Sequence, residues 1–218
     1  MFSQSEENYL KAIFHLTTAE KNGISTNAIA EKLATKPSSV TDMIRKLSDK
    51  KVVSYKKYYG VALTNSGRKI AAYIVRKHRL WEVFLVDKLD FSWDEVHDVA
   101  EQLEHIQSPK LIQQLDQFLG YPTQDPHGDP IPDKDGNLKT IEKCLLSTLA
   151  KNDSGIFVGV DDSSSDFLQF LDRRRITLGK QIKVIEKEDF DESMLIEINS
   201  QKMTISKKIA NNLYIQKS

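Results

Sequence analysis

The sequence has few of the features that mark secreted or membrane proteins. Its 218 residues include a single cysteine, Cys144, which excludes an intramolecular disulfide and a cysteine set for a zinc finger. No apolar run approaches the roughly 18 residues of a candidate membrane helix. The first residues, Met1–Glu7, contain neither the basic nor the apolar region of a signal peptide, so we expect a cytoplasmic protein.

Net charge is also absent, because 31 basic residues balance 31 acidic residues. This balance hides an uneven distribution along the chain. Residues 1–90 contain 16 Lys and Arg against 9 Asp and Glu, whereas residues 91–218 contain 15 against 22. A basic first part suits a polyanionic partner, and an acidic second part suits cations or simply solubility.

Local patterns in the first 64 residues predict three helices followed by a β-hairpin. The expected helices span 5–20, 27–34 and 37–51, and the expected strands span 52–55 and 61–64. Apolar residues recur at helical spacing in the first helix, Ser25 or Thr26 can cap the second, and Pro37 suits the first turn of the third. This order of elements is that of a winged helix-turn-helix.

The rest of the chain divides into a helical part and a β-rich part. Helices are expected over 66–88, 92–106 and 108–119, the second with a capping box formed by Ser92 and Glu95. A loop rich in Pro, Gly and Asp covers 120–137, and four β-like runs follow at 156–160, 182–185, 195–198 and 203–205, around a helix over 166–174. We expect a mainly α protein with small β parts, in three domains over 1–64, 65–137 and 138–218, the last a small β barrel.

The third helix is the expected DNA-recognition helix. Small hydroxyl residues at its start can approach base edges, and its first N–H groups can hold a phosphate. The candidate DNA-binding residues are Lys36, Pro37, Ser38, Ser39, Thr41, Arg45 and Lys46, with Lys50 and Lys51 as further phosphate contacts and Lys56 and Lys57 at the tip of the wing. Two alternatives remain: the lysines only solvate a small helical domain, or the winged helix contacts another protein. The order of the elements favours DNA.

Four of the five histidines lie within residues 78–127, together with carboxylates at helical spacing. The candidate metal ligands in this stretch are His78, Glu82, His97, Glu101, Glu104, His105, Asp125 and His127. The absence of sulfur among them favours Mn(II) or Fe(II) over Cu(I) or a thiolate zinc site. Each residue taken alone could be an ordinary surface or core residue, but the combined spacing favours a divalent-cation site. No nucleophile and base arranged for hydrolysis is evident, so an enzyme is not expected.

These motifs resemble the diphtheria-toxin-repressor family of iron- and manganese-dependent regulators. The segments that carry the resemblance are Pro37-Ser38-Ser39-Val40-Thr41, Leu63-Thr64-Asn65-Ser66-Gly67, Arg76-Lys77-His78-Arg79-Leu80-Trp81-Glu82, Val96-His97-Asp98, Glu104-His105 and Gly128-Asp129-Pro130-Ile131-Pro132. The resemblance implies a winged-helix domain, a helical dimerisation domain that binds the metals, and an SH3-like C-terminal domain. It also implies a homodimer that binds palindromic operators when metal-loaded and represses metal-uptake genes.

The resemblance further implies two metal sites. One would use Asn8, Glu101, Glu104 and His105, with His78 nearby. The family has Met or Asp at the position of Asn8, and manganese-type members have an acid at the position of Lys11, which cannot ligate while protonated. Glu101 stands where iron-type members have Cys, which favours manganese.

The other site implied by the resemblance would use His78 or Glu82, combined either with His97 or with Asp125 and His127. The segment Asp125-Pro126-His127-Gly128 resembles a Cys-Pro-His-Gly segment of manganese-type members. Asp161, Asp162 and Asp166 are candidates for one further acid from the C-terminal domain.

We therefore expect a repressor that responds to Mn(II) first and Fe(II) second, and that binds double-stranded operator DNA as a homodimer. Neither a membrane nor a small organic substrate is an expected partner. Metal would tie Asn8 on the first helix to the dimerisation helices and so fix the spacing of the recognition helices. The alternatives are a winged-helix regulator that senses an organic ligand or a partner, with metal binding incidental, and a metal-dependent hydrolase. Cys144 is expected to be a packed core residue.

Overall fold

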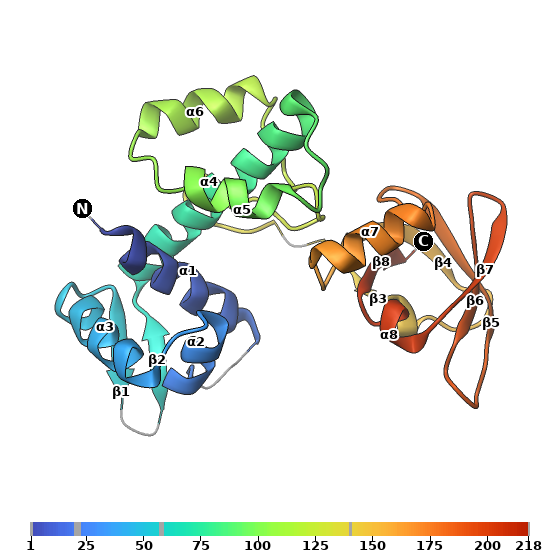
Figure 1. Ribbon diagram of the computed structural model, residues 1–218, viewed down its shortest axis with the longest axis horizontal. Helices are drawn as coiled ribbons and strands as arrows, with labels where there is room; N and C mark the ends of the chain where they lie inside the picture. The colour runs from blue at the N-terminus through green and yellow to red at the C-terminus, as the bar shows by residue number, and fades with distance from the viewer. Residues whose placement is uncertain (1, 20–22, 57–58, 140, 218) are drawn as a thin grey trace. The chain divides into compact units, whose positions relative to one another are not determined.

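The computed structural model describes residues 2–19, 23–56, 59–139 and 141–217 (Figure 1). The chain forms two compact units, each assembled from several segments. The first unit contains residues 1–81, 100–123 and 131–138, and the second contains residues 82–99, 124–130 and 139–218. The boundary between them falls inside the helix α4, Asn65–Leu89, which is continuous. None of the helices among the described residues is long and apolar enough to cross a membrane.

The first unit begins with the expected winged helix-turn-helix. Its elements are α1 (Gln4–Ala19), α2 (Thr26–Lys32), α3 (Pro37–Asp49), β1 (Val53–Lys56) and β2 (Gly60–Leu63), followed by the start of α4. The hairpin is antiparallel and pairs Val53 with Leu63. The side chain of Ser25 caps α2 by accepting the N–H of Ala28 at 3.0 Å, and Pro37 occupies the first turn of α3. The sequence prediction of this fold is confirmed.

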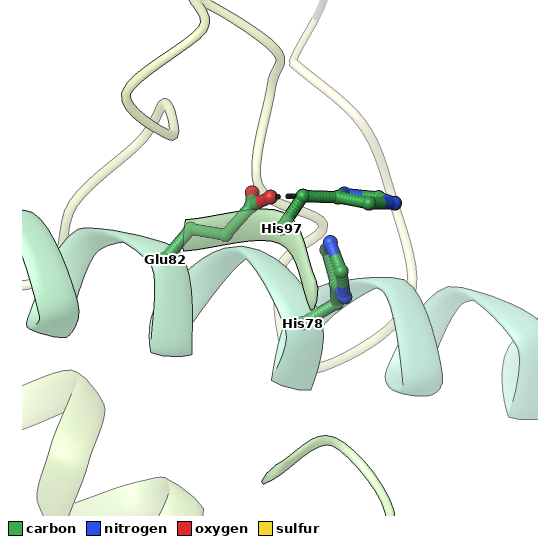
Figure 2. Close-up of side chains that lie close together, drawn as sticks. All are labelled: His78, Glu82 and His97. Carbon is green, nitrogen blue, oxygen red and sulfur yellow. Dashed lines mark hydrogen bonds and ion pairs between the residues drawn. The ribbon is translucent and has the colours of Figure 1, made fainter. Parts of the chain in front are cut away.

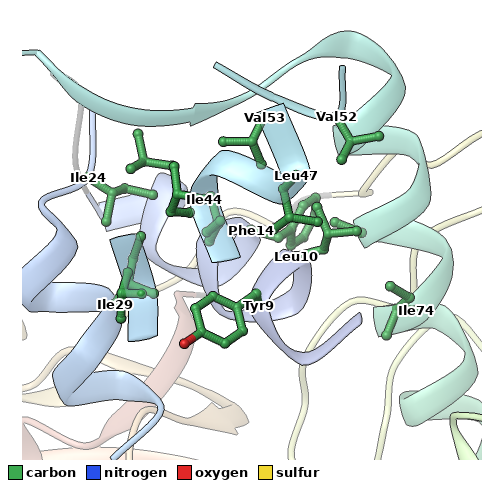
Figure 3. Packing of buried hydrophobic residues seen from close by; sticks show 14 of the residues in the cluster. Tyr9, Leu10, Phe14, Ile24, Ile29, Ile44, Leu47, Val52, Val53 and Ile74 are labelled. Carbon is green, nitrogen blue, oxygen red and sulfur yellow. The ribbon is translucent and has the colours of Figure 1, made fainter. Parts of the chain in front are cut away.

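One apolar core holds the winged helix together (Figure 3). Leu10 of α1, Ile29 of α2 and Leu47 of α3 are fully buried in it. Residues Val40, Ile44 and Leu47 form the buried stripe of α3, which recurs at helical spacing. Each such side chain contributes about 1.5–3 kcal/mol when removed from water. The opposite face of α3 is therefore left to polar residues.

The junction between the wing and α4 depends on a glycine. The Thr64 hydroxyl accepts the N–H of Gly67 at 3.1 Å and donates to the carbonyl of Lys51 at 2.8 Å. A Cβ at Gly67 would lie 1.8 Å from the carbonyl oxygen of Val52, so any larger residue would push α4 away from the hairpin. This contact explains why the segment after the wing carries Thr64 and Gly67.

The remaining helices agree with the predictions except in one length. Helix α6 spans Pro109–Phe118, and the Ser108 side chain accepts the N–H of Leu111 at its start. Helix α5 spans Val96–Leu103, which is shorter than the expected 92–106. The Glu95 carboxylate does accept the N–H of Ser92, as a capping box requires, but it also holds the Ser92 hydroxyl at 2.7 Å. This pair closes a turn before the helix instead of starting the helix itself.

The second unit contains a six-stranded antiparallel sheet, as expected for a mostly β C-terminal domain. Its strands, in the order β3-β8-β4-β5-β6-β7, are β3 (Cys144–Leu145), β8 (Leu213–Lys217), β4 (Ser154–Val160), β5 (Gln181–Lys187), β6 (Met194–Ile198) and β7 (Gln201–Ile205). A 3-10 turn (Leu146–Thr148) and the helices α7 (Ser165–Arg173) and α8 (Lys207–Ala210) complete it. Its core includes Phe157, Ile196 and Ile215. Cys144 packs half-buried against this core, consistent with the expectation.

Candidate metal centre and DNA-binding surface

The strongest candidate metal centre is a buried group of Glu82, Asp125 and His127 in the second unit. One ligand atom from each residue lies within 4.8 Å of the other two. The Nδ1 atom of His127 is 3.9 Å from Glu82 Oε2 and 4.0 Å from Asp125 Oδ1. All three side chains are buried, Glu82 with a relative exposure of 2%. Two carboxylates and an imidazole converging away from water are the donors that a hard divalent cation prefers.

A backbone hydrogen bond of His127 determines which of its two ring nitrogens faces this group. The Nε2 atom lies 2.7 Å from the carbonyl oxygen of Trp93, and because a carbonyl can only accept, Nε2 must carry the proton. In the neutral ring the lone pair then lies on Nδ1, the ring nitrogen that faces Glu82 and Asp125. A backbone carbonyl that fixes the tautomer in this way is typical of metal-binding histidines. The Trp93 ring also stacks on the imidazole at a centroid distance of 6.2 Å.

The loop that carries Asp125 and His127 is held by its own turn and by strand β4. The Asp125 carboxylate accepts the N–H groups of His127 and Asp129 at 2.9 and 3.0 Å. Gly128 has φ +86°, and a Cβ there would lie 2.0 Å from the carbonyl oxygen of Val158. Glycine thus permits both the turn and the close approach to β4. Sequence reasoning had quoted Gly128 only as part of a motif and had missed Trp93.

A second group of three shares Glu82 with the first. His78, Glu82 and His97 also offer ligand atoms within 4.8 Å of one another. Figure 2 shows His78 and Glu82 side by side on successive turns of α4, with His97 reaching Glu82 from the start of α5. His97 Nδ1 is 3.4 Å from Glu82 Oε1, and the His97 side chain is 56% exposed. Because α4 is continuous, the placement of His78 next to Glu82 follows from the helix itself.

The residues expected at the other site have different contacts, all within the first unit. The Glu104 carboxylate is fully buried and lies 2.7 Å from Lys11 Nζ and 2.6 Å from His78 Nδ1. Burial acts to raise the pKa of Glu104, but the His78 hydrogen bond and Lys11 outweigh it and hold that pKa below its usual value. Glu101 is 3.7 Å from Lys11. Protein groups therefore already surround this carboxylate.

His105 does not join Glu104 in a group of three His, Cys, Asp or Glu ligands among the described residues, although its Nε2 lies 3.9 Å from Glu104 Oε1. The Nδ1 atom of His105 lies 2.6 Å from Glu7 Oε2. The amide oxygen of Asn8 is buried and has no hydrogen-bond partner within the described part of the chain. Sequence reasoning missed Glu7, although its four-residue spacing from Lys11 puts both on one face of α1.

The candidate acids of the C-terminal domain also have their own contacts. Asp161 accepts a hydrogen bond from the Tyr214 hydroxyl at 2.6 Å, and burial together with this bond raises the pKa of Tyr214 to about 12. Asp162 accepts the N–H of Ser164, and Asp166 is exposed in the first turn of α7. In the described ranges these three aspartates belong to neither three-ligand group.

The candidate DNA-binding residues lie on the exposed side of α3 and on the wing. The exposed residues are Lys36, Pro37, Ser38, Ser39, Thr41, Arg45, Lys46, Lys51 and Lys56. Lys50 is directed to α1, where it forms an ion pair with Glu6 at 2.7 Å that lowers the pKa of this carboxyl group. Lys57 lies outside the described residues. A basic, hydroxyl-rich face at the start of a recognition helix can follow a phosphate backbone and reach base edges.

Comparison with known proteins finds three family models along the chain. The iron dependent repressor N-terminal DNA binding domain matches residues 1–61, the iron dependent repressor metal binding and dimerisation domain matches residues 64–133, and the FeoA domain matches residues 144–217. The matched segments follow the winged helix, the helical part with the ligand groups, and the six-stranded sheet.

Similar proteins include regulators and solved repressor structures. The HTH-type transcriptional regulator MntR of Oceanobacillus iheyensis is 32% identical over 145 residues, which cover 66% of this chain and 91% of the relative. The iron-dependent repressor IdeR of Mycobacterium tuberculosis is 34% identical over 128 residues, which cover 58% of this chain and 54% of the relative. A manganese-dependent transcriptional repressor in complex with manganese has a TM-score of 0.90 at 33% identity, over 98% of this chain and 100% of that one.

Proposed function

Since this chain belongs to the iron-dependent repressor family of metal-dependent transcriptional regulators, we propose that a divalent cation at the Glu82-centred groups controls its binding to operator DNA. The chain would act as a homodimer and repress genes of metal uptake. The observation that carries the proposal is the buried convergence of Glu82, Asp125 and Nδ1 of His127, whose Nε2 is hydrogen-bonded to the Trp93 carbonyl. The winged helix supplies the surface for DNA.

We assign Mn(II) as the first candidate metal and Fe(II) as the second. The ligands in the two groups are carboxylates and imidazoles, which suit these ions better than they suit Cu(I). The proposed ligands are Glu82, Asp125 and His127, together with His78 and His97. Solved structures similar to this chain include one with manganese and one of the repressor ScaR with cadmium, at TM-scores of 0.90 and 0.80. These support a site that accepts several divalent ions.

The bound ion would supply the positive charge that lets two carboxylates stay close together in a buried place. The chain contributes the geometry: Glu82 comes from α4, whereas Asp125 and His127 come from the loop held against β4. The same helix α4 begins at the wing, directly after β2. We infer that metal binding shifts the population toward the dimer whose recognition helices fit two operator half-sites. By linkage, operator DNA would then tighten metal binding.

We propose that the candidate DNA-binding residues divide into phosphate contacts and base contacts. Lys36, Arg45, Lys46, Lys51, Lys56 and Lys57 would contact phosphates, whereas Pro37, Ser38, Ser39 and Thr41 would lie at the base edges.

We also propose the three-domain division at residues 1–64, 65–137 and 138–218, which the order of the three family models supports.

The test is binding to fluorescent duplex DNA from the upstream region of the gene itself, measured by anisotropy at fixed salt. Titrations with chelator, with Mn(II) and with anaerobic Fe(II) should show sequence-specific binding only with metal. Glu82→Gln removes the shared carboxylate with little change in volume and should abolish the metal stimulation. Glu188→Gln, at an exposed carboxylate of the same unit, should retain it. Equal binding of the unaltered chain with chelator and with metal would leave a DNA-binding protein without a metal switch.

A further inference from the structure

A network of buried charges joins three segments of the first unit. Glu7 and Lys11 come from α1, Lys77 comes from α4, and Glu104 and His105 follow α5. Lys11 Nζ lies 2.7 and 2.8 Å from the two oxygens of Glu104, and Lys77 Nζ lies 3.9 Å from Glu7 Oε2. The network therefore connects the first helix to the chain segment after α5 entirely through protein groups.

Each of the two buried carboxylates of this network has a lysine beside it. The side chains of Lys77 and Glu7 are 2% and 6% exposed, and those of Lys11 and Glu104 are 12% and 0% exposed. Two ammonium groups thus face two carboxylates away from water. A buried carboxylate needs such a partner, because burial without one is strongly unfavourable. In this part of the fold the partner is a lysine.

Two atoms of the group still have the character of metal ligands. The amide oxygen of Asn8 and Glu104 Oε1 are buried and have no hydrogen-bond partner in the described segments, although Lys11 Nζ lies 2.7 Å from Glu104 Oε1 as an ion-pair partner. Asn8 precedes Lys11 by three residues, so both lie on the same face of α1. An amide oxygen can ligate a hard cation, and so can the carboxylate of Glu104. The residues therefore resemble a metal site in which the place of the ion is taken by Lys11.

We propose that Lys11 is a built-in cation that closes a latent second metal site and holds α1 to the segment after α5 without metal. This inference rests on the proposed function, because it leaves the Glu82-centred groups as the metal-responsive part of the chain. An ion that bound Glu104 would first have to displace the Lys11 ammonium, and the two positive charges would then repel each other. The cluster as it stands does not fit a divalent ion.

Metal stoichiometry tests the proposal directly. Each variant is stripped with chelator and dialysed against Mn(II) at a concentration that saturates the unaltered chain, and bound manganese is measured by elemental analysis. In a Glu82→Gln background, Lys11→Glu should gain one Mn(II) per chain, and adding Glu104→Gln should remove it. Lys110→Glu makes the same charge change at an exposed lysine of α6 and should gain nothing.

Hydrogen exchange of α1 supplies a second measurement that does not depend on metal binding. In the metal-free chain, Lys11→Met should lower the protection of α1 amides at least tenfold, whereas Lys11→Arg keeps a cation and should preserve it. If Lys11→Met fails to fold, the stoichiometry of Lys11→Arg remains informative, because it should equal that of the unaltered chain.

The outcomes separate this inference from the proposed function. If the Glu82→Gln chain with its native Lys11 binds manganese that Glu104→Gln removes, Lys11 does not close the site and the inference fails. If the unaltered chain binds no manganese at all, the proposed function fails instead. Unchanged α1 protection in Lys11→Met would contradict the role of Lys11 in holding the helix.

Discussion

Replacing Gly128 with alanine should weaken metal binding through the backbone, without touching a ligand. The added Cβ would lie 2.0 Å from the carbonyl oxygen of Val158 and 2.5 Å from the Cα of Gly159. The first distance is about 1.4 Å short of the 3.4 Å at which ordinary contact begins. Both obstacles are backbone atoms at strand β4, so the loop must move instead. That loop carries Asp125 and His127.

The size of the effect follows from this displacement. Metal–ligand distances tolerate deviations of only about 0.2 Å, several times less than the required movement. Loss of the support around a metal site typically costs tenfold to a hundredfold in affinity, and we expect a loss of about that size for Gly128→Ala. This corresponds to about 1.4–2.8 kcal/mol of binding free energy.

Gly179 provides the matched control, because it has a φ of +80° and no atom within 4 Å of an added Cβ. Both substitutions strain the backbone by about 1–2 kcal/mol, and both should lower the free energy of unfolding of the metal-free protein. Only Gly128→Ala should also lower the affinity for Mn(II), measured by isothermal titration calorimetry. Equal affinities for the two variants would refute the reasoning that β4 positions the ligand loop.

Three further predictions concern the first unit. Lys36→Ala should weaken binding to all DNA sequences alike and reduce the slope of log affinity against log salt by about 0.9, whereas exposed Lys180→Ala should not; a change confined to one sequence would contradict a phosphate contact. Burial, with Arg79 and Lys32 nearby, lowers the pKa of His15 from 6.5 to about 3, so its ring should stay neutral between pH 5 and 8 in an NMR titration. Because only the unfolded chain then takes up a proton on His15, the free energy of unfolding should fall as the pH drops below about 6.5. A His15 NMR signal that titrates near pH 6.5 in the folded protein would contradict the lowered pKa. Leu47→Ala should lower the free energy of unfolding by about 2–5 kcal/mol in urea denaturation, and a loss below about 1 kcal/mol would show that the core tolerates the cavity.

The winged helix could be predicted from the sequence because its signals are local. The periodic apolar residues of α3, the cap at Ser25 and the position of Pro37 each act within one helical turn, and the structure contains each of them. The edge strand β3 was missed because its two residues are too few to show alternation. Strand β8 does alternate, with Leu213 and Ile215 buried, but it was not recognised next to the chain end.

The ligand groups were predictable only where their members share a helix. His78 and Glu82 are four residues apart, so helical geometry places them together whatever the rest of the chain does. The ion pair between Lys11 and Glu104 joins residues 93 positions apart, and only tertiary packing brings them together. The same holds for the carbonyl of Trp93, which orients His127 although no side-chain pattern could point to it.

The stacking of Trp93 on His127 gives the metal centre an optical reporter of its own. The indole and imidazole rings are nearly parallel, with an interplanar angle of 14°, and the Trp93 carbonyl holds the same imidazole. Indole fluorescence responds to the charge and electron density of a neighbouring ring, and a paramagnetic ion such as Mn(II) quenches it at short range. Binding of a metal ion at His127 should therefore change the emission of Trp93, so that metal binding can be followed by intrinsic fluorescence without an added label.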